Sequence, residues 1–132
     1  MIEQEFVSFE TAKLLKEKGF DEYCFYWYTS NGEMYSDPGE YKEFKNSESI
    51  SHITAPTQDL AMRWLREVHH LHCDIGYDIE LGWYHQIVNL KETVSVFDYN
   101  EMRVYHSDHD FEFHNYEEAA EAAIKYCLES LI

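Results

Sequence analysis

The stretch from Leu71 to Glu80 constrains the fold more than any other part of the chain, because its side chains alternate strictly in polarity. The apolar positions are Leu71, Cys73, Ile75, Tyr77 and Ile79, and between them lie His72, Asp74, Gly76, Asp78 and Glu80. Successive side chains of a β-strand point to opposite faces of the sheet, so this pattern predicts a strand with one buried and one solvated face. Such strands are typical of antiparallel sheets.

Three other segments have the patterns of helices. Ser8 is a favourable N-cap and Gly19 a favourable left-handed stop for a first short helix. A second helix is expected to begin after Pro56, which suits a helix entrance. Its apolar stripe comprises Leu60, Ala61, Trp64, Leu65 and Val68. Asn115 is expected to start the last helix, because Glu118 follows at the spacing of a capping box.

The remaining strands are predicted from aromatic and β-branched segments. Residues 23–28 and a strand beginning at Met34 flank an Asn31-Gly32 pair, the signal of a tight hairpin. Further strands are expected near 83–90, near 93–99 and within 102–113. The sequence therefore predicts an α+β fold, with an antiparallel sheet of about five strands packed with three helices. The expected order is α-β-β-α-β-β-β(-β)-α, in a single globular domain over residues 1–132.

The charge of the chain limits its partners. Ten Lys and Arg against 26 Asp and Glu give a formal charge of −16. Such a surface repels phosphate backbones and anionic membranes, so we expect no direct nucleic-acid binding and no membrane binding. Basic proteins, cations or solubility alone remain as reasons for the acidity.

The three cysteines, Cys24, Cys73 and Cys127, are odd in number and have no metal-like spacing. This argues against a disulfide framework and for a reducing compartment. The chain shows no signal-peptide pattern at its start, and its densest apolar run, 24–28, is far too short to cross a bilayer. We therefore expect a cytoplasmic protein.

Imidazoles and carboxylates fall on one side of two segments. If 106–114 is extended, one face carries His106, Asp108, Asp110, Glu112 and His114, and the polar face near 72–80 carries His72, Asp74, Asp78 and Glu80. His72, Asp74, His106, Asp108, Asp110 and His114 are the candidate ligands of a divalent metal, which could activate a water for hydrolysis. The competing interpretation is an ordinary solvated sheet face, which needs no cofactor. The sequence contains no H-E-x-x-H and no C-x-x-C motif.

The aromatic hairpin is the candidate partner-binding surface. Alternation places Tyr26 and Tyr28 on one face of their strand, opposite Tyr23, Phe25 and Trp27. If no helix covers them, Tyr26, Tyr28 and the nearby Tyr35 form a patch suited to a protein partner or to a homodimer. The alternative is that helices cover both faces.

Three segments resemble a known group of proteins: VSFETAKLLKEKGFDEYCF near the start, APTQDLAMRWLRE in the middle and NYEEAAEAAIKYCLESLI at the end. Together and in this order they are similar to a family of short, uncharacterised proteins carried by phages and prophages of gut Bacteroidetes. Between these segments only the pattern of the strands matches. The resemblance implies a phage-linked cytoplasmic accessory protein and implies no catalytic residues.

These observations leave two main hypotheses. The first is a non-enzymatic protein that binds a protein partner, basic in character, through an acidic and aromatic surface, with counter-defence as the biological role. The second is a small metal-dependent hydrolase or nucleotide-binding protein that uses the His/Asp/Glu face. A third arrangement, a nucleotide stacked in an aromatic dimer interface, requires Arg63, Arg66 and Arg103 to gather locally.

Overall fold

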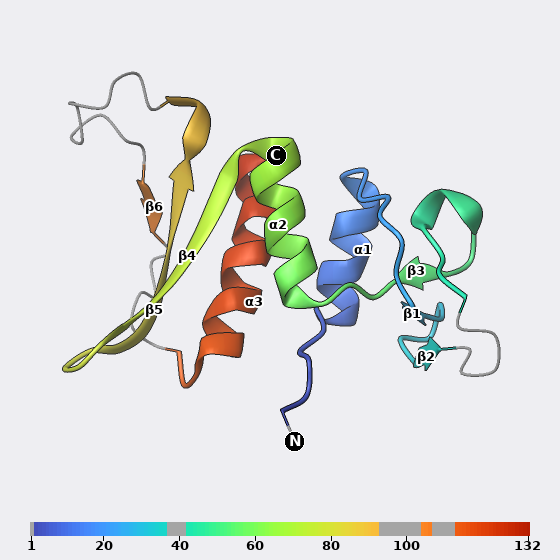
Figure 1. The fold of residues 1–132 in the computed structure, drawn as a ribbon, viewed down its shortest axis with the longest axis horizontal. Coiled ribbons are helices and arrows are strands. Elements are labelled where there is room, and N and C mark those ends of the chain that lie inside the picture. The colour runs from blue at the N-terminus through green and yellow to red at the C-terminus, as the bar shows by residue number, and fades with distance from the viewer. Residues whose placement is uncertain (1, 37–41, 93–103, 107–112) are drawn as a thin grey trace. The chain divides into compact units, whose positions relative to one another are not determined.

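The computed structural model describes residues 2–36, 42–92, 104–106 and 113–132 (Figure 1). It has helices and antiparallel sheets, so the predicted α+β class is confirmed. Contacts within the chain divide it into two compact units, Met1–Leu60 and Ala61–Ile132, which we call unit 1 and unit 2. The prediction of one domain over 1–132 stays a prediction.

Unit 1 is built from helix α1 (Phe9–Glu17) and a three-stranded antiparallel sheet in the order β2-β1-β3. The predicted caps of α1 are confirmed: Ser8 Oγ accepts the backbone N–H of Thr11 at 3.2 Å, and Gly19 has a φ of 91°. The three strands are β1 (Tyr26–Tyr28), β2 (Met34–Ser36) and β3 (Ile53–Thr54). The predicted hairpin is present, and Gly32 in its connection has a φ of 83°, but Asn31 has no positive φ and the connection spans residues 29–33, so the turn is longer than a tight Asn-Gly turn.

Two side chains fix the segment that leads into β3. Asn46, buried in a short 3₁₀ turn (Asn46–Glu48), donates its amide to Phe20 O at 2.8 Å and accepts the N–H of Thr54 at 2.9 Å. Lys16 Nζ on α1 donates to the carbonyl oxygens of Ser49 at 3.0 Å and of His52 at 2.9 Å. An irregular segment is therefore held by specific polar contacts instead of a long sheet ladder.

Unit 2 contains most of helix α2 (Gln58–His69), strands β4 (Leu71–Asp78), β5 (Gly82–Asn89) and β6 (Val104–His106), and helix α3 (Tyr116–Tyr126). The sheet is antiparallel in the order β4-β5-β6, and α3 packs against β4 and β5 (Figure 1). A five-residue π-helical turn, Cys127–Leu131, follows α3. Asn115 caps α3 as predicted, since its Oδ1 accepts the N–H of Glu118 at 2.8 Å.

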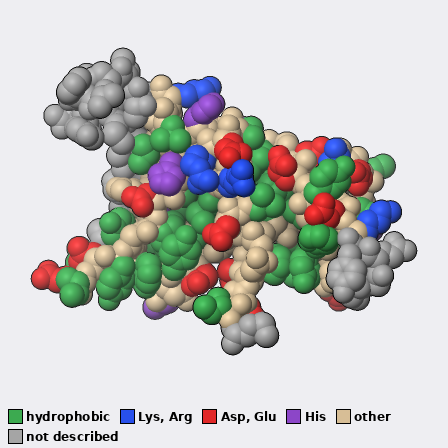
Figure 2. All heavy atoms as spheres, in the orientation of Figure 1, with side chains coloured by type: hydrophobic (Ala, Val, Ile, Leu, Met, Phe, Trp, Pro, Cys, Tyr) green, Lys and Arg blue, Asp and Glu red, His purple; other side chains and the backbone are tan. Residues whose placement is uncertain are grey.

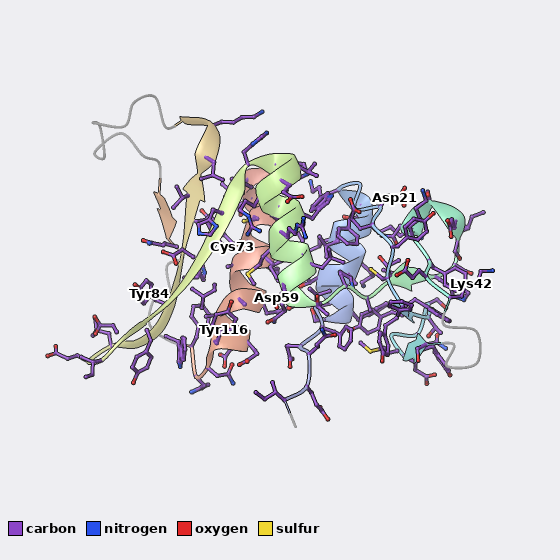
Figure 3. All side chains as sticks on the ribbon, in the orientation of Figure 1. Asp21, Lys42, Asp59, Cys73, Tyr84 and Tyr116 are labelled. Carbon is purple, nitrogen blue, oxygen red and sulfur yellow. The ribbon has the colours of Figure 1, made fainter. Side chains whose placement is uncertain are left out.

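The core of unit 2 lies on the face of the sheet that the alternation predicted to be buried. Cys73 on β4 points toward α3 (Figure 3), and its Sγ lies 3.8 Å from Sγ of Cys127. The alanines at 119, 120 and 123 are fully buried, which lets the helix approach the sheet closely. The stripe predicted for α2 needs one correction: Val68 is 53% exposed, and Met62 is buried instead.

The prediction of a single sheet of about five strands is not confirmed, because the described strands form two sheets of three. In unit 1 both edges of β1 are already paired, with β2 and with β3, and in unit 2 both edges of β5 are paired with β4 and β6. Side-chain alternation reveals which segments are extended but carries no information about which edges pair. The two-residue β3 was not predicted. The strand predicted near 93–99 lies outside the described residues, and β6 falls within the predicted 102–113 segment.

A close contact across the β4–β5 ladder gives a first testable prediction. Gly76 pairs with Tyr84 (labelled in Figure 3), and a methyl group at Gly76 would overlap the Tyr84 ring. We expect Gly76→Ala to lower the free energy of unfolding by about 1 kcal/mol, since the ring must leave its cross-strand position. Urea denaturation measures this loss. In a Tyr84→Ser background the same substitution should cost nothing, and an equal cost in both backgrounds would contradict the explanation.

Candidate functional site

The candidate functional site is an exposed aromatic surface of unit 1. It contains Tyr26, one of the residues that the sequence predicted to bind a partner. Tyr23, Phe25 and Tyr26 are 51%, 47% and 39% exposed, although all three are large aromatic side chains. They lie at the start of β1, where Cys24 forms a bridge with Phe44 and its N–H donates to Phe44 O at 2.7 Å. The backbone at this point is therefore fixed while the neighbouring rings remain accessible.

A pocket of about 130 Å³ opens between these rings, and we call it the aromatic pocket. It is lined by Gln4, Phe6, Tyr23, Cys24, Phe25, Tyr26, Ala55, Pro56, Thr57 and Leu60. Phe6 forms one wall, with its ring centroid 4.8 Å from that of Tyr26. The volume suits a single apolar side chain and is small for a drug-sized ligand.

Backbone hydrogen bonds hold the wall of the pocket in place. The N–H of Val7 donates to Pro56 O at 3.0 Å, and the N–H of Gln58 donates to Glu5 O at 2.9 Å. Phe6, between these two bonds, forms an antiparallel bridge with Thr57. The N-terminal segment is thus ordered along 55–58, and the aromatic pocket exists before any ligand arrives.

Three exposed glutamates are next to lining residues of the aromatic pocket in the sequence. Glu3 and Glu5 flank the lining residue Gln4 in the sequence, Glu22 precedes Tyr23, and all three glutamates are exposed. Lys45 Nζ lies 5.1 Å from the centroid of the Tyr23 ring, a cation–π arrangement. The surface can therefore attract cations by charge and accept them on its aromatic faces.

The structure separates the three tyrosines that the sequence placed in one patch. Tyr28 is buried, its hydroxyl donates to Val7 O at 2.6 Å, and its ring lies 5.5 Å from that of Phe9 on α1. Tyr35 is 48% exposed but pairs with Trp27, so it lies on the sheet face opposite to Tyr26. The expectation that Tyr28 and Tyr35 share an exposed surface with Tyr26 is therefore corrected.

The proposed metal ligands are only partly assembled by the described structure. His72 and Asp74 do share a face of β4, and His106 on β6 is paired in register with Gln86. However, Asp74 Oδ2 accepts the side-chain amide of Gln86 at 2.6 Å, which places a donor where a cation would bind.

The other proposed ligands add no support for a metal centre. The backbone N–H of His114 donates to Glu118 at the start of α3. Asp108 and Asp110 lie outside the described residues. Within 2–36, 42–92, 104–106 and 113–132, no group of three His, Cys, Asp or Glu side chains is arranged to hold a metal ion.

The three thiols are poorly suited to nucleophilic catalysis. Burial raises the pKa of Cys24 to about 11. The hydrogen bond with Cys73, together with burial, raises the pKa of Cys127 far above its ordinary range. Since the thiolate is the reactive form, all three buried cysteines have the character of core residues, as their apolar surroundings in the sequence predicted.

Sequence reasoning missed the exposed turn that joins β4 and β5. Ile79 was expected on the core face but is 90% exposed, because β4 ends at Asp78. Asp78 Oδ1 accepts the N–H groups of Glu80 and Leu81, each at 2.9 Å, and Gly82 has a φ of 96°. An Asp followed four positions later by a Gly is a turn signal, and it could have shown that the alternation stops at Asp78.

Comparisons of the chain with protein-family models, curated proteins and solved structures find no match. Among the described helices, none combines the length and the apolar character needed to cross a bilayer.

Proposed function

We propose that this protein is a non-enzymatic, phage-linked accessory protein that binds a basic protein partner through the aromatic pocket of unit 1. The observation that carries the proposal is a pocket of side-chain size between exposed rings, beside exposed carboxylates. Protein interfaces concentrate their binding energy in such aromatic centres, where one anchor residue fills a preformed pocket. A cytoplasmic location and a role in counter-defence belong to the same proposal.

The chemistry of the pocket defines the partner. An apolar side chain would enter the space next to Phe6 and Tyr26, and a neighbouring Lys or Arg would meet Glu3, Glu5 or Glu22. The overall charge of −16 would accelerate the encounter with a basic protein. A partner that normally binds nucleic acid offers the required positive surface, and the acidic protein would then occupy that surface in place of phosphates.

The experiment is a pull-down at low salt from a lysate of a gut Bacteroidetes bacterium, with Tyr26→Ser compared with Tyr35→Ser. The two tyrosines are exposed to a similar degree and belong to the same hairpin, but they lie on opposite faces of its sheet. We expect one basic protein to bind the wild-type chain and Tyr35→Ser and to be lost with Tyr26→Ser. It should be released by 0.5 M salt, about three times the physiological ionic strength.

Two results would contradict the proposal. One is that the wild-type chain reproducibly recovers no protein from the lysate. The other is equal recovery by both variants, which would place the binding surface elsewhere. Thermal unfolding of both variants provides the control, since a partner lost through misfolding of Tyr26→Ser would be accompanied by a lower melting temperature.

The metal-dependent alternative has weaker support, because Asp74 is bound to the amide of Gln86 instead of lying open to a cation. Metal analysis of protein purified without a His tag tests it. A bound divalent ion that raises the melting temperature would favour a hydrolase over the binding protein.

A further inference from the structure

We propose that the β4–β5 turn is a second protein-docking surface, which inserts Ile79 and Leu81 into an apolar cavity bordered by Lys and Arg side chains of a partner. We call residues 77–81 the hairpin tip. It belongs to unit 2 and shares no residue with the aromatic pocket, so this inference does not depend on the function proposed above.

The first step of the argument is that the turn does not need apolar side chains. Its backbone is set by the carboxylate of Asp78, which accepts two N–H groups, and by Gly82 in the left-handed region. Positions 79–81 could therefore carry any polar residue at no conformational cost. Instead Ile79 is 90% exposed and Leu81 is 58% exposed. Large apolar side chains gathered at an exposed turn mark an interaction surface.

The second step is that the hairpin tip is held rigidly. Strands β4 and β5 pair without interruption from Leu71↔Asn89 to Asp78↔Gly82. Next to the turn, the ring centroids of Tyr77 and Trp83 are 5.1 Å apart. The Trp83 ring also packs edge to face against the ring of Tyr116 on α3, with 6.0 Å between the two centroids. Figure 3 labels Tyr116, which lies at the N-terminal end of α3. A preorganised surface loses little conformational entropy when a partner binds.

Charge decides between the kinds of partner. Asp78 and Glu80 alternate with the apolar residues of the hairpin tip, and the exposed Glu117 follows Tyr116. The sequence from 67 to 90 contains no Lys or Arg. Figure 2 shows hydrophobic and acidic side chains together at this end of the hairpin. A second copy of the chain would bring the same carboxylates against these ones, and phosphates would be repelled, so the complementary surface is a basic protein.

The test uses two synthetic amphipathic peptides as probes, one of Leu and Lys and a matched one of Leu and Glu, with binding measured by calorimetry. We expect the Leu–Lys peptide to bind the wild-type chain and to bind Ile79→Ser/Leu81→Ser at least tenfold more weakly. The Leu–Glu peptide should bind neither. Ile50→Ser is the matched control, because Ile50 is fully exposed in unit 1. It should leave the affinity unchanged.

Equal affinity of the Leu–Lys peptide for the wild-type chain and the tip variant would overturn the proposal. So would a wild-type dimer in sedimentation that the tip variant abolishes, because the occupant would then be a second copy. The variant Glu80→Lys separates charge from apolar contact and should also weaken binding of the Leu–Lys peptide. The aromatic pocket of unit 1 also suits an apolar side chain beside a basic one, so the comparison is repeated in a Tyr26→Ser background. The tip substitutions should still weaken binding at least tenfold there, so the docking surfaces of units 1 and 2 can fail independently.

Discussion

Replacing Asn46 by Ala is expected to lower the free energy of unfolding by about 2–4 kcal/mol, because two buried hydrogen bonds disappear at once. The side-chain amide of Asn46 donates to Phe20 O and its oxygen accepts the N–H of Thr54, and the residue is only 7% exposed. Alanine can supply neither group. The buried N–H of Thr54 would lose the acceptor that holds it, and water could not easily replace that acceptor at this depth.

Urea denaturation followed by circular dichroism measures the loss. Glu48→Ala is the matched control, since Glu48 lies in the same 3₁₀ turn but is exposed, and it should change the free energy by less than about 0.5 kcal/mol. If Asn46→Ala unfolds at the same urea concentration as Glu48→Ala, then Asn46 is not what orders the segment before β3.

The thiol of Cys24 is expected to react with iodoacetamide at pH 8 about 100-fold more slowly in the folded chain than in the unfolded chain. Burial raises its pKa from an ordinary 9.0 to about 11, so the thiolate fraction at pH 8 falls by that factor. Because Cys24 is 6% exposed, restricted access slows the reaction further. Site-resolved mass spectrometry measures the rate for this cysteine separately from Cys73 and Cys127.

The same raised pKa predicts how stability depends on pH. The folded chain holds the proton of Cys24 more tightly than the unfolded chain does. The stabilisation that the protonated thiol of Cys24 gives to the folded chain is therefore fully present below pH 9. It is lost as the pH rises from about 9 to about 11, and the free energy of unfolding falls by at most about 1.4 kcal/mol per pH unit. Cys24→Ser should flatten the profile in that range. Rapid alkylation of Cys24 in the folded chain at pH 8 would contradict the burial of this thiol. So would a dependence of stability on pH that is the same in Cys24→Ser as in the wild-type chain.

Local signals in the sequence were sufficient to predict much of the fold. Ser8, Gly19 and Asn115 mark helix ends through hydrogen bonds or backbone angles that each forms with its own neighbours, and the structure contains those interactions. The Asn31-Gly32 pair located the first hairpin for the same reason, although the connection is longer than a two-residue turn. Such features depend on a few consecutive residues, so a single sequence reveals them.

Features that depend on distant segments could not be predicted in this way. The division into two sheets depends on which strand edges meet, and alternation contains no such information. The burial of Tyr28 depends on Phe9, which lies on another element. The candidate site was therefore only partly predicted: Tyr26 is exposed, but Tyr28 is buried and Tyr35 lies on the opposite face. In the hairpin tip, Tyr77 and Ile79 were expected on the core face but are exposed.

The hydrogen bonds from Lys16 to two backbone carbonyls should make this lysine harder to modify than the exposed lysines of the chain. Its ammonium group lies against Ser49 O and His52 O, so one of only ten basic side chains orders unit 1 instead of balancing surface acids. Acetylation or carbamylation of this amine would remove both the charge and the geometry of these contacts. Covalent labelling of lysines would consequently report on the attachment of residues 49–52 to α1, with Lys16 protected for as long as that attachment persists.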